Sequence, residues 1–221
     1  MSLTLSGTNG VVGAGFTLDA SGASVTAGVG TFSSLQGSAA SLTSIPAANI
    51  VGLATAGFNR SGGFPEGVTT AQQFRLTSGL SVSNSATTLS ANWEKVDGVG
   101  QGALGSFADP SSGIFTFPST GIYLVRFNGY FEDTGDTPLS QLRILATTNN
   151  SSYTAIAEVN TSNSNLDTYT YSAGSVETII DVTDTSNVKV YFDARNTNTA
   201  NLDGSSTQNR TYVTFIRLGD T

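Results

Sequence analysis

Cysteine and histidine are both absent from the 221 residues of the chain. Without cysteine there is no disulfide framework and no thiolate metal site. Without histidine the chain lacks the commonest general base and the commonest ligand of transition metals. Stability must therefore come from a hydrophobic core or from oligomerisation, and chemistry that depends on an imidazole or a thiolate is excluded.

Charge is also scarce, since only 11% of the residues are charged and the formal net charge is −7. Typical globular domains carry about 25% charged residues. The nine basic residues are scattered, whereas a nucleic-acid-binding protein needs a basic stripe, so no nucleic-acid partner is expected. No run approaches 18 apolar residues, so no membrane insertion is expected. The first ten residues lack a basic n-region and an apolar h-region, which predicts that they are not a Sec signal peptide.

The first 67 residues hold 13 of the 25 glycines and three charges, Asp19, Arg60 and Glu66. Their apolar residues stand singly, and serine, threonine and glycine between them disfavour helix. Short strands broken by glycine turns are expected, either in ordered structure, intertwined with sister chains or docked on a particle, or in a loose flexible arm. The apolar residues proposed as anchors are Leu18, Val25, Phe32, Leu35 and Leu42.

These patterns divide the chain into an extended anchoring segment (1–62), a hinge (63–72) and a head domain (73–221). Residues 44–57 could form a helix that begins near Pro46, or equally a docking strand. Glycine and proline cluster from Gly62 to Gly67 and indicate the hinge.

From residue 73 onward, apolar and polar residues alternate in many short runs that are separated by turn signals. This pattern predicts an all-β domain, an antiparallel sandwich or barrel. The expected strands cover residues 74–76, 113–117, 122–131, 139–146, 153–159, 168–173, 176–182, 188–194 and 212–218.

The centre of this domain reads FADPSSGIFTFPSTGIYLVRF over residues 107–127. Asp109 and Pro110 fix a turn, and Gly113 supplies a position with positive φ. Alternation places Tyr123 on the same strand face as Val125 and Phe127, while Ile122 and Leu124 point to the other face. The residues that carry this motif and core are Asp109, Pro110, Gly113, Phe115, Phe117, Gly121, Tyr123, Val125, Phe127 and, in a later strand, Phe215.

This motif resembles the globular-head family of the first complement component and the related tumour-necrosis-factor ligands. The likeness also takes in Ser111 and Pro118 of the motif, the residues Trp93–Val96 upstream, and the closing strand Tyr212–Ile216. It implies a jelly roll that assembles as a homotrimer, with one sheet face turned to neighbouring subunits. A monomeric sandwich that packs on its own N-terminal segment is the alternative.

The N-terminal segment resembles fibre and appendage proteins of tailed phages, particularly those of marine and cyanobacterial hosts. That resemblance implies a virion protein that assembles in the host cytoplasm and leaves by lysis. Its partners would be itself, other virion proteins through the N-terminal segment, and a host-surface glycan or protein.

Two polar stretches are candidate exposed binding loops. One holds Glu132, Asp133 and Asp136 in a predicted hairpin turn. The other, residues 196–209, holds Asn198, Asn201 and Asp203, and its amides and hydroxyls could contact sugars. The alternative for both is a solvated loop. The acidic turns could bind Ca²⁺, as some members of the resembling family do. No other cofactor is expected.

Three functions are compatible with the sequence. The first is a non-enzymatic trimeric surface fibre or appendage, with the head outward. The second is a trimeric capsid decoration protein that clamps the phage head. The third is a carbohydrate-degrading tailspike, which needs two placed carboxylates in a cleft. No catalytic residue is assigned.

Overall fold

The computed structural model describes residues 16–19, 22–25, 67–164 and 167–221. The chain divides into two compact units, Met1–Asn59 and Arg60–Thr221. The described residues form strands and turns without a helix, and the strand pairs are antiparallel. This confirms the predicted all-β class.

In the first unit, β1 (Phe16–Asp19) and β2 (Gly22–Val25) pair as an antiparallel hairpin in which Phe16 lies opposite Val25. Leu18 and Val25 therefore belong to strands. Phe32, Leu35 and Leu42 lie outside the described residues, as do the predicted 44–57 segment and most of the predicted hinge. The anchoring role of these residues stays a prediction.

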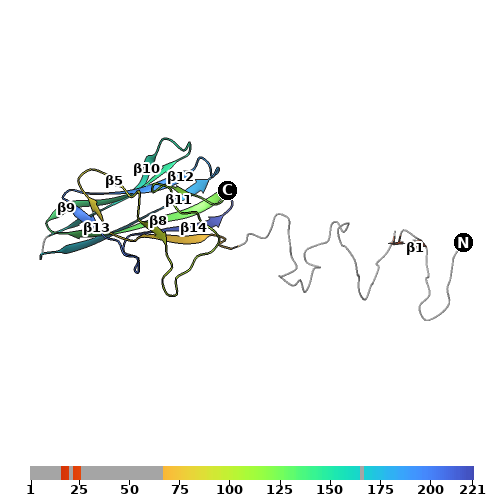
Figure 1. The fold of residues 1–221 in the computed structure, drawn as a ribbon. Helices are drawn as coiled ribbons and strands as arrows, with labels where there is room; N and C mark the ends of the chain where they lie inside the picture. The colour runs from red at the N-terminus through yellow and green to blue at the C-terminus, as the bar shows by residue number, and fades with distance from the viewer. Residues whose placement is uncertain (1–15, 20–21, 26–66, 165–166) are drawn as a thin grey trace. The chain divides into compact units, whose positions relative to one another are not determined.

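The second unit is a sandwich of two sheets (Figure 1). The larger sheet has the order β11-β8-β14-β3-β6, and β13 and β4 continue it beside the far end of β8. Its strands are β3 (Ala71–Leu76), β4 (Leu80–Val82), β6 (Trp93–Lys95), β8 (Gly121–Asp133), β11 (Thr170–Val182), β13 (Ala200–Leu202) and β14 (Tyr212–Gly219).

The smaller sheet has the order β10-β9-β12, and two short strands pair with different parts of β12. Its strands are β5 (Thr87–Thr88), β7 (Phe115–Thr116), β9 (Thr137–Thr147), β10 (Thr154–Asn163) and β12 (Lys189–Asn196). The chain passes from β8 to the smaller sheet, back for β11, across again for β12 and back for β14. This crossing between two antiparallel sheets makes the domain a jelly roll.

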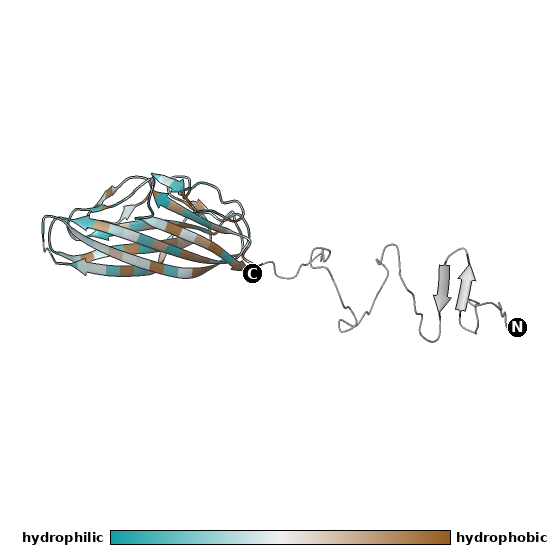
Figure 2. Ribbon diagram, turned by 90° about the horizontal axis from the view of Figure 1, so that it is seen from below, coloured by the Kyte–Doolittle hydropathy of each residue, from teal (hydrophilic) through white to brown (hydrophobic). Residues whose placement is uncertain are grey.

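Alternation along β8 builds the core. Tyr123, Val125 and Phe127 have no exposed surface, while Ile122 and Leu124 are partly exposed on the opposite face. Figure 2 shows the same change between apolar and polar residues along the strands. Phenylalanines from both sheets fill the centre, where Phe115 lies 5.4 Å from Phe192 and 5.2 Å from Phe215 between ring centroids. Aromatic pairs at such distances add to the free energy gained from burial alone.

The 107–127 motif closes one edge of this core. Phe107, Phe115 and Phe117 are all buried. Gly113 has a φ of 77°, and a Cβ there would come within 2.3 Å of the Leu89 carbonyl oxygen, so both the backbone angle and the space require glycine. Gly121, with a φ of 137°, begins β8. Asp109 is an exposed turn residue whose carboxylate lies 3.4 Å from the Lys95 ammonium.

Two sequence predictions about elements are wrong, those for residues 168–182 and for residues 196–209. The two strands predicted at 168–173 and 176–182 are one strand, β11 (Thr170–Val182), because Gly174 fits closely against Leu142 and Val159 and makes no turn. Near the start of the head, β3 begins at Ala71, and Thr70 before it is buried. Residues 196–209 are not one long loop, because β13 lies within them and pairs with β4, which is distant in sequence.

Candidate functional site

The larger sheet has a face that turns away from the smaller sheet, and we call it the outer face. Backbone pairing lines up Ile179 with Leu124, Leu124 with Ile216, and Ile216 with Ala71. Register partners share a face, so these four side chains cross the sheet side by side on β11, β8, β14 and β3. We call them the apolar row.

The apolar row is accessible to solvent. Ile179 is 63% exposed, and the other three residues are partly exposed. Leu104 extends the row beyond β3 because its backbone bridges to Ala71, and its side chain is 48% exposed. A continuous apolar strip across four strands is unusual for a surface that faces water, since exposed apolar residues normally stand singly.

The next row along the outer face is polar, and its side chains form an ion pair and a hydrogen bond with one another. Arg126 lies 2.8 Å from Glu177 across the sheet, and Gln73 donates to the Thr214 hydroxyl at 2.9 Å. Two residues farther along β3 from Gln73, Arg75 is buried and its guanidinium contacts Glu94 and Asp97, each at 2.6 Å. Arg75, Arg126 and Glu177 are therefore paired within the subunit, whereas Asp181, in register with Ile122 on this face, is exposed.

A shallow hollow of about 420 Å³ lies on the outer face near the end of β8. The Tyr130 and Tyr171 rings stack above it with centroids 5.5 Å apart and planes inclined by 21°. We call this the tyrosine hollow; the residues that line it are Tyr130, Glu132, Tyr171, Gln208, Asn209 and Arg210.

The polar groups of the tyrosine hollow are fixed by their neighbours. Arg210 forms an ion pair with Asp203, and Asn209 donates from Nδ2 to the Gln73 side chain at 3.2 Å. Desolvation, followed by the nearby Glu132 carboxylate, raises the pKa of Tyr171, so its phenol stays neutral at ordinary pH. Asn209 Oδ1 is buried and has no hydrogen-bond partner among the described residues.

Asp133 corrects the sequence prediction of an exposed binding residue. It is 2% exposed and accepts hydrogen bonds from the Thr134 and Gly135 backbone amides at 2.9 and 3.3 Å. Its other oxygen accepts from the Thr137 hydroxyl and from Asn196 Nδ2. The carboxylate caps the β8–β9 turn from inside. Its burial is tolerated because both of its oxygens accept hydrogen bonds.

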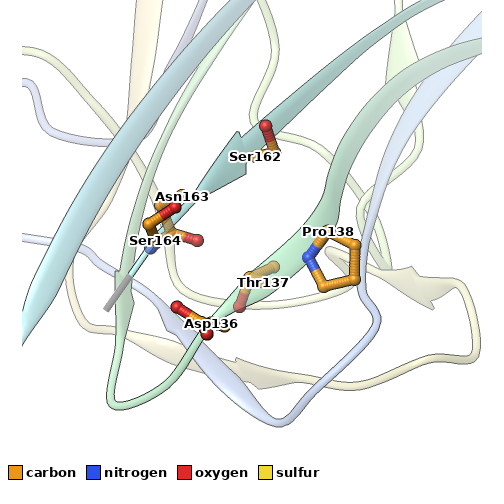
Figure 3. A pocket seen from close by; sticks show the side chains of 6 residues that line it. All are labelled: Asp136, Thr137, Pro138, Ser162, Asn163 and Ser164. Atoms are coloured by element: carbon orange, nitrogen blue, oxygen red, sulfur yellow. The ribbon is translucent and has the colours of Figure 1, made fainter. Parts of the chain in front are cut away.

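Asp136 and Asn198 are exposed, as predicted for loop tips, and the structure brings them together. Asn198 Nδ2 donates to the Asp136 carbonyl oxygen at 2.5 Å, and its backbone amide donates to Asn196 Oδ1 at 2.8 Å. Beside them lies a second hollow of about 410 Å³ with a polar lining (Figure 3). The residues around it are Asp136, Thr137, Pro138, Ser162, Asn163 and Ser164.

The remaining predicted residues are Glu132 in β8, Asn201 in β13 and Asp203 directly after β13. Glu132 pairs in register with Asn201, and both are half-buried within strands. The Asn201 side chain lies so close to Gly79 that a Cβ there would approach its oxygen to 2.4 Å. Asp203 is 8% exposed, so it is not an exposed binding residue, because its carboxylate is used by Arg210.

Sequence reasoning predicted that Leu124 lies on a second apolar face, but it missed the alignment of Leu124 with the rest of the apolar row and missed the tyrosine hollow. The signal for the row was present in the adjacent apolar pairs Ile179–Ile180 and Phe215–Ile216, which place an apolar residue on each face of a strand. In the described residues, no group of three or more acidic, cysteine or histidine side chains is placed to hold a metal ion. Nor does any helix there reach the length and apolarity that crossing a membrane requires.

No protein-family model and no curated protein matches the chain. Among solved structures, it is similar to Eiger TNF from S. frugiperda, with 16% identity and a TM-score of 0.49 over 71% of this chain and 96% of that chain. It is also similar to murine APRIL at pH 5.0, with 15% identity and a TM-score of 0.43 over 67% of this chain and 98% of that chain. The likeness concerns the fold, and the strand order described above assigns this domain to the antiparallel jelly rolls.

Proposed function

We propose that this chain is a non-enzymatic structural protein of a phage virion whose jelly-roll head assembles with copies of itself into a homotrimer. The observation that carries the proposal is the apolar row. Four aligned side chains on the outer face gain free energy when they leave water, at roughly 25 cal/mol per Å² of apolar surface. An identical subunit is the partner that best fits this face.

Charge supports an identical partner. In a closed trimer, equivalent residues approach one another around the threefold axis, so unpaired charges of one sign near that axis weaken association. Arg126 and Glu177 beside the apolar row neutralise each other within one subunit. This row can thus enter a subunit interface without unpaired charge, although the chain as a whole carries a formal net charge of −7.

The trimeric state and the virion role are each supported by a resemblance to known proteins. The 107–127 motif resembles heads that form trimers, and the low-charge segment before residue 62 resembles phage fibre and appendage proteins. The structural role is supported by Asp133, whose carboxylate oxygens are occupied by turn contacts and so are not available as a nucleophile or base.

The assembly is tested on the full chain by sedimentation equilibrium at micromolar concentration. The wild type is expected as a trimer, and Ile179→Glu as a monomer with unchanged circular dichroism. Ile156→Glu is the matched control, because Ile156 is 45% exposed but belongs to β10 in the smaller sheet. A monomeric wild type, or equal behaviour of the two variants, contradicts the proposal.

The virion role is tested by quantifying the protein in purified particles. A fibre is expected at a few tens of copies per particle and a decoration protein at roughly hundreds, as closed symmetry dictates. Deletion of residues 1–62 is expected to prevent incorporation into particles. Normal incorporation of that deletion variant would indicate that the head docks by itself and would favour capsid decoration.

A further inference from the structure

The tyrosine hollow lies at the opposite end of the outer face from the apolar row. Leu124 and Tyr130 are six residues apart on β8, which at about 3.3 Å per residue separates them by about 20 Å. The chain enters the domain beside the row, because β3 begins at Ala71 in register with Ile216. The hollow therefore belongs to the end of the sandwich remote from that entrance.

The hollow combines a flat apolar surface with several hydrogen-bonding groups. Tyr171 is 51% exposed and stacks on Tyr130, so a wide aromatic surface faces solvent. The neighbouring Tyr169 is 53% exposed. Exposed aromatic rings beside polar side chains are enriched where proteins bind partners, because the ring buries apolar surface while the polar groups set orientation.

The polar groups around the rings include both hydrogen-bond donors and hydrogen-bond acceptors, and a hydroxyl group of a ligand can bond to either. Glu132 is an acceptor, and the Arg210 guanidinium donates. Gln208 supplies an exposed amide that both donates and accepts. Arg210 is held by Asp203, so the donor is positioned before any ligand arrives.

The local charge selects against anionic ligands. Asp203 neutralises Arg210, and the Glu132 carboxylate then leaves the hollow with a net negative charge. A phosphate or a sulfated or carboxylated sugar would be repelled, whereas a neutral ligand with hydroxyl groups and one apolar face would be accepted. A pyranose ring has this combination.

We propose that the tyrosine hollow binds a neutral pyranose of a surface glycan, with one sugar face packed on Tyr171 and its hydroxyls bonded by Glu132, Gln208 and Arg210. The site lies within one subunit and so does not depend on the proposed assembly. A single shallow site of this kind binds weakly, and several copies on one particle raise the avidity without new contacts.

The test is saturation-transfer NMR on the full chain, with the methyl glycosides of glucose, galactose and N-acetylglucosamine as probes. At least one glycoside is expected to bind with a millimolar Kd, and Tyr171→Ala is expected to weaken that binding at least tenfold. Tyr153→Ala is the matched control, because Tyr153 also contacts a second tyrosine, Tyr191 at 4.9 Å, but belongs to the other side of the sandwich. It is expected to bind as the wild type does.

Sedimentation of the same samples separates this proposal from the assembly. If Tyr171→Ala alters the sedimentation coefficient, Gln208→Ala replaces it as the deciding variant, since Gln208 is an exposed residue between strands. The proposal is overturned if none of the three glycosides binds at 20 mM, or if binding survives the deciding variant. Loss of binding in that variant and retention in Tyr153→Ala supports it, whatever the oligomeric state.

Discussion

Both faces of the larger sheet carry apolar residues along β8, but the two sets lie in opposite environments. On the inner face Tyr123, Val125 and Phe127 have no exposed surface. On the outer face the neighbouring residues Ile122 and Leu124 stay partly exposed. The inner residues form the core of one subunit, and the outer ones are available for contacts between subunits.

This difference shows that apolar character alone does not distinguish folding from assembly. A residue contributes to the stability of the subunit in proportion to the surface that its own chain covers. The two faces therefore predict two separable phenotypes, loss of fold and loss of association, from residues that are adjacent in sequence. The predictions below test that separation.

The largest effect is expected for truncation on the inner face. Phe127→Ala removes a fully buried ring that lies 5.0 Å from Phe192, and Tyr123→Ala removes one that also bonds to Ser119. Each is expected to lower the free energy of unfolding by about 3–5 kcal/mol. Chemical denaturation followed by circular dichroism measures it. A loss below about 1 kcal/mol would mean that the inner face is assigned wrongly.

A smaller effect is expected from a polar residue that the core encloses. Asp133→Ala leaves buried donors without an acceptor and is expected to cost about 3 kcal/mol. Asp136→Ala, in the same turn, changes an exposed carboxylate and is expected to stay within about 0.5 kcal/mol. Denaturation midpoints of the two variants decide the point. If the two variants lose the same free energy of unfolding, the buried hydrogen bonds of Asp133 do not stabilise the turn.

On the outer face, Leu124→Ala is expected to change the free energy of unfolding of the isolated subunit by less than about 1 kcal/mol. Its main effect is expected on association. A melting temperature that rises with protein concentration reports association of the native state. That dependence is expected to flatten in Leu124→Ala. If the variant keeps the wild-type dependence and loses stability instead, the outer face belongs to the fold and not to assembly.

The smallest effect concerns pH and a turn outside both faces. Hydrogen bonds from the Ser186 backbone amide and the Asn187 side chain lower the pKa of Asp184 below its ordinary value of 3.8. The ionised carboxylate therefore stabilises the fold above pH 3.8, and this contribution is lost as the pH falls through the lower, folded-state pKa. Asp184→Asn is expected to make the melting temperature fall less steeply below about pH 4. Identical slopes in wild type and variant would contradict this.

Residues 122–131 show what could be predicted from sequence. Their strict alternation predicted a strand with one fully buried face, and β8 has that face. The φ of Gly113 follows the turn pattern that Asp109 and Pro110 begin. These features depend on backbone geometry and on residues close together in sequence, so local pattern is sufficient to predict them.

Asp133, Asp203 and Asn201 show where local pattern fails. All three stand among turn-forming polar residues, which normally indicates exposure, yet partners from strands distant in sequence hold them. Asn196 reaches Asp133 from β12, and β4 pairs with the strand that carries Asn201. Such partners are chosen by sheet topology, which no short window contains.

The sequence by itself determined the all-β class, the exclusion of thiol and imidazole chemistry, and which residues of β8 face the core, because composition and a period of two are local properties. Only the tertiary structure decided that Ala71, Leu124, Ile179 and Ile216 form one row, and that Tyr130 and Tyr171 stack above a hollow with Arg210. Each of these sites gathers residues from different strands. Their alignment depends on pairing register, which packing of the whole sandwich fixes.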